Sequence, residues 1–542
     1  MFSGPLCVIS PGSLVPPFRK QREIHELRKL ASSRSSKQIM SDSFHRKFFE
    51  RLRSAPKSIL GFLVVLVIAG AINLALGAPV NLYLTIALML GAALLLWLRF
   101  VDANFTQHRI RATFRTADQW PILSRVYPLY KWVDLYRACE TVKQTYTAQT
   151  VLLTEHNMPL KYLLQENLWE SLKMPLKPPT LMPRKVSPTE EIFLPSDTLW
   201  LVRDDKTLPQ GAILRVHLIS YNQMVQLEVA APDSGDATKI LDAILERASS
   251  HSIYRQHIIT PVFQKQIKSS FRDDEGNLGF DLLFEPDPMV TDEKIILDEN
   301  VRRVVERTVI DFHTRRAELM EYGLPGRRGI LFYGPPGTGK TYTCKYIAHK
   351  LDTATTIIAT GHALTQIKAV CDLAKMFQPS LVILEDVDLM FSEREVNPYT
   401  PLLGDLLDEL DGFQQNDQII FVLTTNAIER VEGAIKNRPG RISQCIYLGP
   451  PTPKLRREYL SVLLKPYNTN AVNLDHIVSE TEGVSQAFLK EMIFRAVQIA
   501  TERNLDGEGV VMQQKDISTA IGEMTAGGGR FGKRIIGFQV EP

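Results

Sequence analysis

Residues 334–341 read GPPGTGKT, and their types and spacing suit the binding of phosphate groups. Glycines let such a loop turn its backbone N–H groups inward around phosphate oxygens, and a helix that follows adds the positive end of its dipole. Lys340 is expected to neutralise the β and γ phosphates of a nucleotide, and Thr341 to offer its hydroxyl to Mg²⁺. The predicted nucleotide-binding residues are Gly334, Pro335, Pro336, Gly337, Thr338, Gly339, Lys340, Thr341 and Tyr342.

A second set of polar side chains follows two apolar runs further along the chain. Residues 381–384 lead into Glu385 and Asp386, and residues 419–423 come shortly before Asn426. Carboxylates at the end of a strand beside a phosphate loop can hold Mg²⁺ and polarise an attacking water, and an amide there lies near the γ-phosphate. We expect Asp386 to polarise the water. The predicted metal ligands are Thr341, Glu385 and Asp386.

Three strands are needed to bring these groups together. The apolar run 329–333 ends at the phosphate loop, just as runs 381–384 and 419–423 end at the acidic and amide groups. Ligands of doubly wound α/β proteins lie at the carboxyl edge of a parallel sheet. The predicted fold class is therefore α/β, with the parallel sheet of a P-loop nucleoside triphosphatase.

A fourth motif follows the phosphate loop, the acidic residues and the amide in the sequence. Residues 437–441 read NRPGR, and together with GPPGTGKT, LVILED and TTN they resemble the motifs of the AAA ATPase family over about residues 291–525. The resemblance implies ATP and Mg²⁺ as cofactors and a homo-oligomeric ring, usually a hexamer, with ATP between subunits. In it, Arg438 and Arg441 match the arginines that reach into the neighbour's nucleotide, where a planar guanidinium stabilises transition-state charge. The implied catalytic residues are Glu385, Asp386, Asn426, Arg438 and Arg441.

The same resemblance divides the second half of the chain. Residues 291–450 are similar to the family's ATPase core and residues 451–525 to its small helical lid. Within the lid, residues 483–489 resemble a G-x-S-x-A-x-L segment whose backbone and small side chains approach the adenosine. A lid of this kind couples the nucleotide state to the angle between subunits.

Two departures from the family pattern bear on mechanism. The usual acidic order is Asp then Glu, whereas here Glu385 precedes Asp386, whose side chain is shorter by one C–C bond of roughly 1.5 Å. The Glu-Asp order is similar to that of the mitochondrial inner-membrane AAA chaperones that insert the Rieske iron–sulfur protein, which have one spanning helix. Residues 359–373 lack the aromatic pore loop of many protein-threading members, so hand-over-hand threading is in doubt.

The composition narrows the remaining function classes. The chain has 542 residues, and its 63 basic and 60 acidic side chains leave a net charge of +3, which gives no support for nucleic-acid binding. Its five cysteines show no C-x-x-C spacing, so neither a disulfide scaffold nor a zinc module is indicated. We expect a reduced protein that faces the cytosol.

Residues 59–98 contain no charged side chain and predict a membrane anchor. Broken at residues 77–79, the run gives two segments of about 18 to 20 residues, each near the length that a spanning helix needs. We predict a transmembrane hairpin over residues 58–100. Because Lys and Arg flank both outer ends, both should lie on the cytoplasmic or matrix side, which makes a multi-pass membrane protein with its ATPase domain on that side.

The other boundaries follow from composition and periodicity. Residues 1–57 are basic and are expected to be flexible; they also suit a transit peptide, with Met40 as an alternative start. Apolar residues at helical spacing in 237–248 predict a helix, and β-rich runs predict strands at 192–202, 212–230, 253–263 and 279–284. The predicted segments are a helical region with a Pro-rich linker over 101–189, a small α+β domain over 190–290 and a tail over 526–542.

Four functions remain open. The first is a membrane-anchored AAA ATPase that remodels, inserts or disassembles an unknown protein client near the bilayer. The second, a membrane-tethered AAA metalloprotease, is disfavoured because the sequence has no H-E-x-x-H motif and no long domain after the lid. The third is an ATP-binding scaffold or switch that hydrolyses weakly because of the Glu-Asp order. The fourth, an ATP-driven transporter, is disfavoured because two helices with few polar residues offer no substrate path.

Overall fold

The computed structural model describes most of the chain after the first hundred residues. The described residues are 106–153, 159–164, 179–204, 206, 208–219, 224–263, 280–389, 406, 408–409, 412–431, 442–503 and 511–526, together with Gly91. The predicted basic N-terminus, the transmembrane hairpin apart from Gly91, nearly all of the predicted tail, and both Arg438 and Arg441 lie outside them. Among the described residues, no helix has both the length and the apolar character that crossing a bilayer requires.

The chain divides into two compact units, which are treated separately. The first comprises residues 1–119, 151–184 and 192–196. Its described part buries Ile110 and Phe114, and a short apolar helix in it buries Leu160 and Leu163. Its elements are α5 (Thr106–Thr113), the 3₁₀ turn η1 (Ala117–Gln119) and α7 (Leu160–Leu164), and two paired strands, β3 (Leu181–Lys185) and β4 (Glu191–Pro195), lie mostly within it.

The second unit begins with a small α+β domain built on a five-stranded sheet. Its strand order is β1-β7-β6-β5-β2, and the pairs β1–β7, β7–β6 and β6–β5 are antiparallel. The region expected to be helical over 101–189 thus also supplies strands, because neither ILSRVYP (residues 122–128) nor TAQTVLL (residues 147–153) alternates regularly between apolar and polar residues. The strands are β1 (Ile122–Pro128), β2 (Thr147–Leu153), β5 (Asp197–Asp204), β6 (Leu208–Ile219) and β7 (Met224–Ala230).

Two helices pack on this sheet and against each other: α6 (Lys131–Thr145) and α9 (Ser234–Ser250). The predicted helix over 237–248 is confirmed. Asp233 caps its start by accepting from the backbone N–H groups of residues 235 and 236. The helices lie on the face of the sheet that carries Trp200, whose indole Nε1 donates to Glu140 Oε1 of α6 at 2.6 Å.

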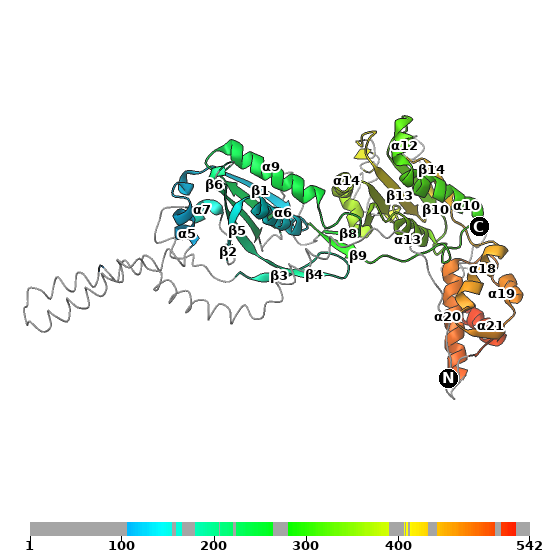
Figure 1. The fold of residues 1–542 in the computed structure, drawn as a ribbon. Coiled ribbons are helices and arrows are strands. Elements are labelled where there is room, and N and C mark those ends of the chain that lie inside the picture. Colours follow the sequence, from blue (N-terminus) through cyan, green and yellow to red (C-terminus); the bar gives the residue numbers. More distant parts are fainter. Residues whose placement is uncertain are drawn as a thin grey trace, which may run out of the picture. The chain divides into compact units, whose positions relative to one another are not determined.

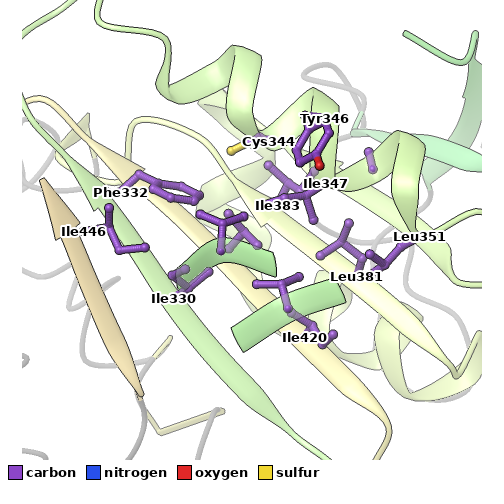
Figure 2. Packing of buried hydrophobic residues seen from close by; sticks show 14 of the residues in the cluster. Ile330, Phe332, Cys344, Tyr346, Ile347, Leu351, Leu381, Ile383, Ile420 and Ile446 are labelled. Atoms are coloured by element: carbon purple, nitrogen blue, oxygen red, sulfur yellow. The ribbon is translucent and has the colours of Figure 1, made fainter. Parts of the chain in front are cut away.

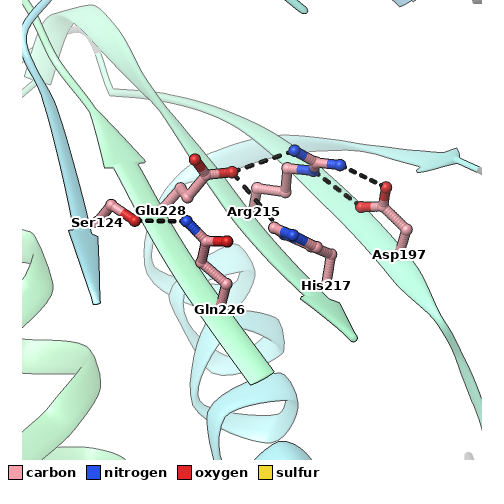
Figure 3. A network of polar contacts seen from close by, with 6 residues as sticks. All are labelled: Ser124, Asp197, Arg215, His217, Gln226 and Glu228. Carbon is pink, nitrogen blue, oxygen red and sulfur yellow. Dashed lines mark hydrogen bonds and ion pairs between the residues drawn. The ribbon is translucent and has the colours of Figure 1, made fainter. Parts of the chain in front are cut away.

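The opposite face of the same sheet holds a buried ion network (Figure 3). The guanidinium of Arg215 donates to Asp197 at 2.7 and 3.0 Å and to Glu228 at 3.1 Å, and all three side chains are almost fully buried. Burial, together with the neighbouring Arg215, lowers the pKa of His217 to about 3, so this histidine is neutral. Removing any one of these three side chains would leave a buried charge without its partner, which destabilises a fold. Each charge therefore stabilises the sheet only while the other charges of the network are present.

The ATPase core is a seven-stranded sheet in the order β14-β10-β13-β12-β11-β8-β9. The strands from β14 to β8 pair in parallel and β9 runs antiparallel at the edge, which agrees with the predicted α/β class. The strands are β8 (Ile258–Phe263), β9 (Phe280–Glu285), β10 (Arg328–Tyr333), β11 (Thr355–Ala359), β12 (Ser380–Leu384), β13 (Ile419–Thr425) and β14 (Gln444–Tyr447).

The position of β8 and β9 corrects the predicted boundary between the small domain and the core. Both strands exist where the sequence indicates them, but they extend the ATPase sheet instead of the small domain's sheet. Ile258 and Ile259 pair with Thr356 and Ile357 of β11. A period-two pattern identifies a strand and says nothing about its partner, so the sequence alone did not show this pairing.

Helices cover both faces of the core sheet, as a parallel sheet requires. On one face, alternate residues of β10, β12 and β13 pack against α13 (Lys340–Lys350), as Figure 2 shows for Phe332, Ile383 and Ile347. On the other face, α14 (Ile367–Met376) buries Val370 and Cys371 near β11 and β12. The preceding segment contains α10 (Glu299–Val305), the π-helical turn η2 (Glu306–Asp311), α11 (Phe312–Thr314) and α12 (Arg316–Glu321), and the 3₁₀ turn η3 (Gly361–Gln366) precedes α14.

The lid is helical, as predicted. Figure 1 shows its labelled helices gathered into one bundle. Phe488, Met492 and Ile493 form the centre of its apolar core. The elements are α18 (Pro453–Leu464), β15 (Asn468–Ala471), α19 (Leu474–Glu480), α20 (Gln486–Arg503), β16 (Val511–Gln513) and α21 (Gln514–Ala526), with β15 and β16 paired in parallel.

Candidate functional site

The phosphate-loop residues lie between the end of β10 and the start of α13, as the sequence predicts. Three glycines of the loop have positive φ: Gly334 at 147°, Gly337 at 77° and Gly339 at 92°. A Cβ on Gly334 would lie 2.1 Å from the carbonyl oxygen of Leu448, which follows β14. Glycine is therefore required there both for its conformation and for the close approach of two backbones.

Lys340 begins α13 and turns back over the loop. Its Nζ donates to the carbonyl oxygens of Gly334 at 2.9 Å and Pro335 at 2.8 Å, and the residue is buried. Burial lowers the pKa of Lys340, while the charges of Asp386 and Asp388 act in the opposite direction. A partly desolvated ammonium group at the mouth of a glycine loop is suited to binding phosphate oxygens, because its charge is weakly screened there.

The lid closes on the same loop. The backbone N–H of Ala487 donates to the carbonyl oxygen of Gly337 at 3.1 Å. A Cβ on Gly337 would lie 2.8 Å from the Cβ of Ala487 and 3.0 Å from the Oγ of Ser485. The segment expected to approach the adenosine thus contacts the phosphate loop directly, through backbone and small side chains.

The first acidic residue faces the start of α13. The Thr341 side chain is a hydrogen-bonding partner of Glu385, which follows β12 directly. Burial raises the pKa of Glu385; this hydrogen bond lowers it, and the neighbouring Asp386 raises it. Oxygen ligands of this kind fit Mg²⁺, which takes hydroxyl, carboxylate and phosphate oxygens. In the described part of the chain, His, Cys, Asp and Glu side chains form no cluster of three or more that could hold a metal by themselves.

The second acidic residue faces the amide. Asn426 Nδ2 donates to Asp386 Oδ1 at 2.9 Å, across the ends of β13 and β12. The two acidic residues therefore have different neighbours: Glu385 contacts the hydroxyl beside the phosphate loop, and Asp386 contacts Asn426. This division is the one expected if Glu385 holds Mg²⁺ and Asp386 polarises water.

Two neighbours of this pair were not among the predicted site residues. Asp388 Oδ1 accepts from Thr425 Oγ1 at 2.8 Å and from the backbone N–H of Asn426 at 3.0 Å. Thr424 Oγ1 accepts from the backbone N–H of Asp386 at 2.9 Å. The sequence could have indicated that these threonines belong to the site, because Thr424 and Thr425 are polar residues that end an otherwise apolar strand.

The other predicted residues are placed less centrally. Tyr342 is 42% exposed on α13, and partial burial raises the pKa of its hydroxyl. The roles of Tyr342, Arg438 and Arg441 stay predictions, as do those of the other predicted site residues.

Comparisons with known proteins agree with this geometry. Residues 330–450 match the model of a family described as "ATPase family associated with various cellular activities (AAA)". The chain is 32% identical over 222 residues to the ATP-dependent zinc metalloprotease FtsH 2 of Thermoanaerobacter sp. (strain X514). This match covers 38% of this chain and 42% of that protein. It is also 31% identical over 246 residues to the proteasome-activating nucleotidase of Thermococcus onnurineus, covering 42% of this chain and 60% of that protein.

A third relative gives the same result. The chain is 29% identical over 246 residues to the 26S proteasome regulatory subunit 8 homolog of Schizosaccharomyces pombe, covering 42% of this chain and 59% of that protein. The chain thus spans less than two thirds of the length of each of these relatives. The matched family, the strand order and the grouped polar side chains make residues 330–450 an ATPase domain of the AAA type.

Proposed function

Because residues 330–450 are an AAA-type ATPase domain, we propose that this chain is a membrane-anchored ATPase that remodels, inserts or disassembles a protein partner. The proposal that this chain hydrolyses ATP rests on the grouping of polar side chains at the carboxyl edge of the sheet. Lys340 lies over the phosphate loop, Glu385 is paired with Thr341, and Asp386 is bonded to Asn426. These contacts support the division of roles that we propose.

In the proposed reaction, Lys340 and the loop N–H groups bind the β and γ phosphates. Thr341 and Glu385 would hold Mg²⁺, which when bound neutralises charge shared by the two phosphates. Asp386 accepts a hydrogen bond from the attacking water, and Asn426 holds the Asp386 carboxylate in place. The water oxygen bonds to the γ phosphorus while the bond from that phosphorus to the β–γ bridging oxygen breaks, which yields ADP and phosphate.

The contact between Asp386 and Asn426 favours hydrolysis over the alternative of an ATP-binding switch. A shorter acidic side chain in an unchanged backbone would fall short of the amide by roughly 1.5 Å. Here the amide is within hydrogen-bond distance, at 2.9 Å. The Glu-Asp order therefore does not by itself separate the acid from the amide.

We propose further that the active unit is a homo-oligomeric ring, with six subunits by the family resemblance. Arg438 and Arg441 would act on the nucleotide of the neighbouring subunit. An arginine supplied across a subunit boundary stabilises charge that develops on the transferred phosphoryl group. Such an arrangement couples each hydrolysis event to the geometry of the next subunit.

The membrane part of the proposal rests on the sequence. Residues 59–98 hold no charged side chain, and basic residues flank both ends of this run. That pattern supports two spanning helices with the ATPase domain on the cytoplasmic or matrix side. A protein client near the bilayer fits this anchor, and the relatives' names include a metalloprotease, a proteasome regulatory subunit homolog and a proteasome-activating nucleotidase.

A nucleotide-dependent trap tests the proposed function. The full-length Asp386→Asn variant, which should retain ATP without cleaving it, is crosslinked in its native membrane, and bound proteins are compared by mass spectrometry with those of Lys340→Ala. We expect one or a few proteins to be enriched only with Asp386→Asn, and to be released from the wild-type protein when ATP and Mg²⁺ are added. An identical set of crosslinked proteins for both variants would count against ATP-driven work on a client.

A further inference from the structure

The backbone at Asp386 adopts a conformation that L-amino acids rarely take. Its φ is 53°, and it shares a positive φ with only two other non-glycine residues in the part of the chain that the structure describes, Gln256 and Met289. A left-handed conformation is unfavourable for a residue with a Cβ, so it persists where surrounding contacts hold it. Asp386 lies directly after Glu385, at the point where the chain leaves β12.

Two of the hydrogen bonds that hold this turn come from one residue of the neighbouring strand. Thr424 Oγ1 accepts from the backbone N–H of Asp386 at 2.9 Å, and the Thr424 carbonyl oxygen accepts from the N–H of Val387 at 2.9 Å. Thr424 is 1% exposed, so its hydroxyl is shielded from competing water. In the regular ladder below, Leu384 pairs with Leu423 through the backbone alone.

The same strand also holds the side chain of Asp386. Thr424 and Asn426 are two residues apart on a strand and its extension, so their side chains project to the same side. The Thr424 hydroxyl accepts from the Asp386 backbone, while Asn426 Nδ2 donates to the Asp386 carboxylate at 2.9 Å. Thr425, between them, donates instead to Asp388. The backbone and the carboxylate of Asp386 are thus fixed by alternate residues of one strand end.

We propose that Thr424 is a positioning residue for hydrolysis, whose hydroxyl fixes the left-handed turn that brings the short Asp386 carboxylate to its working position. An aspartate side chain is shorter than a glutamate side chain by one C–C bond, roughly 1.5 Å. In this proposal the turn moves the Asp386 backbone so that its carboxylate still reaches that position. The inference rests on the proposed ATPase function and adds a specific requirement to it: the turn suits an aspartate at position 386 and not a glutamate.

If Thr424 has only a structural role, the loss of its hydroxyl should have different effects from those expected of a positioning residue. If its hydroxyl only satisfies a buried N–H, its loss lowers the melting temperature and reduces all activities in proportion to the unfolded fraction. A positioning role separates two kinetic constants. The turnover number falls because the acid is displaced, whereas the KM for ATP and the affinity for nucleotide stay unchanged, because neither Lys340 nor the loop is touched.

The test uses the full-length protein in detergent with Mg²⁺ and ATP. Thr424→Val removes the hydroxyl at nearly constant volume, Thr424→Ser keeps it, and Thr356→Val is the matched control, a threonine on β11 of the same sheet with the same 1% exposure. We measure kcat, KM, the affinity for a fluorescent ATP analogue and the melting temperature. We expect Thr424→Val to lose about tenfold or more in kcat with KM and affinity within about twofold, and Thr424→Ser to recover most of the turnover.

A second variant keeps the inference open to refutation if Thr424→Val folds poorly. Asp386→Glu restores the usual length, and within the fixed turn its carboxylate should overshoot, so kcat should fall below that of the wild type. A kcat raised by Asp386→Glu, or equal losses in Thr424→Val and Thr356→Val, overturns the positioning role. A folded wild-type protein that does not cleave ATP at all would instead refute the proposed function itself, and the positioning role with it.

Discussion

Glu385 and Asp386 are adjacent in the sequence but have different surroundings, and the different roles proposed for them rest on this difference. Glu385 is partly buried and paired with Thr341, a donor set that suits a metal ligand. Asp386 turns out of the sheet and meets Asn426. The sequence order alone left it open whether the short acid at position 386 could act, since the side chain is one bond shorter than usual. The structure shows a left-handed backbone at this residue and a contact with Asn426, neither of which a local sequence pattern predicts.

Exchanging each acid for its amide should separate the two roles. Asp386→Asn should bind Mg²⁺ and ATP with nearly wild-type affinity and lose about a hundredfold or more in turnover, because the neutral amide is far less basic than the carboxylate that polarises the water. Glu385→Gln should raise the Mg²⁺ concentration needed for half-maximal turnover, because a carboxylate ligand is lost. Steady-state kinetics against Mg²⁺ concentration and nucleotide binding assays measure both. Full turnover in Asp386→Asn with a dead Glu385→Gln would reverse the assignment.

At the scale of elements, local patterns predicted the existence of strands and helices better than their partners. The runs before the phosphate loop and before Glu385 became β10 and β12, because each is apolar throughout, as a strand buried on both faces must be. The run at 253–263 was identified as a strand, yet its assignment to the small domain was wrong. Its partner, β11, lies about a hundred residues later in the chain, and the pairing depends on the tertiary fold.

The join between α6 and the segment before β8 gives a pH-dependent prediction. Asp134 of α6 accepts from Ser252 Oγ at 2.5 Å and from the backbone N–H of Ile253 at 2.9 Å, and it is buried. Burial raises its pKa from 3.8 to about 6, although these hydrogen bonds act to lower it. The folded state therefore holds this proton more tightly than the unfolded chain. The stabilisation is complete below about pH 4 and is lost as the pH rises through about 6.

Asp134→Asn should remove this dependence, because the amide stays neutral and can still accept from Ile253. Relative to the wild type, the variant should gain stability between about pH 4 and pH 7, by on the order of 3 kcal/mol, which is the raised pKa expressed as free energy. Melting temperatures of both proteins across this range are the measurement. Parallel pH profiles for the two proteins would show that Asp134 does not titrate in this way.

For the whole molecule, the proposed ring makes each nucleotide site depend on a second subunit. The core and lid motifs were identified from sequence because each lies in a short contiguous stretch, such as residues 334–341. Assembly is set by surfaces that no motif describes, and the two arginines that would cross between subunits, Arg438 and Arg441, lie outside the described residues. The number of subunits and the client therefore remain proposals.

Mixing of variants tests whether subunits share sites. Arg438→Ala or Arg441→Ala should leave ATP affinity within about twofold and reduce turnover by about a hundredfold or more, since the arginine acts only on transition-state charge. Rings that mix the Arg438→Ala variant with Lys340→Ala should recover part of the turnover, because an intact phosphate loop can then face an intact arginine. Mixtures no more active than the two variants alone, or a strictly monomeric protein with full turnover, would contradict a shared site.

The central claim, that the glycine loop and the acidic strand end cleave ATP, is tested most directly by phosphate release from Mg²⁺ and ATP. The full-length protein in detergent is compared with Lys340→Ala and with Lys239→Ala, an exposed lysine on α9 that serves as the control. The account predicts steady phosphate release by the wild type and Lys239→Ala, and a loss of about a hundredfold or more in Lys340→Ala. Unchanged release by Lys340→Ala, or a well-folded wild-type protein that neither binds nor cleaves ATP, would contradict it.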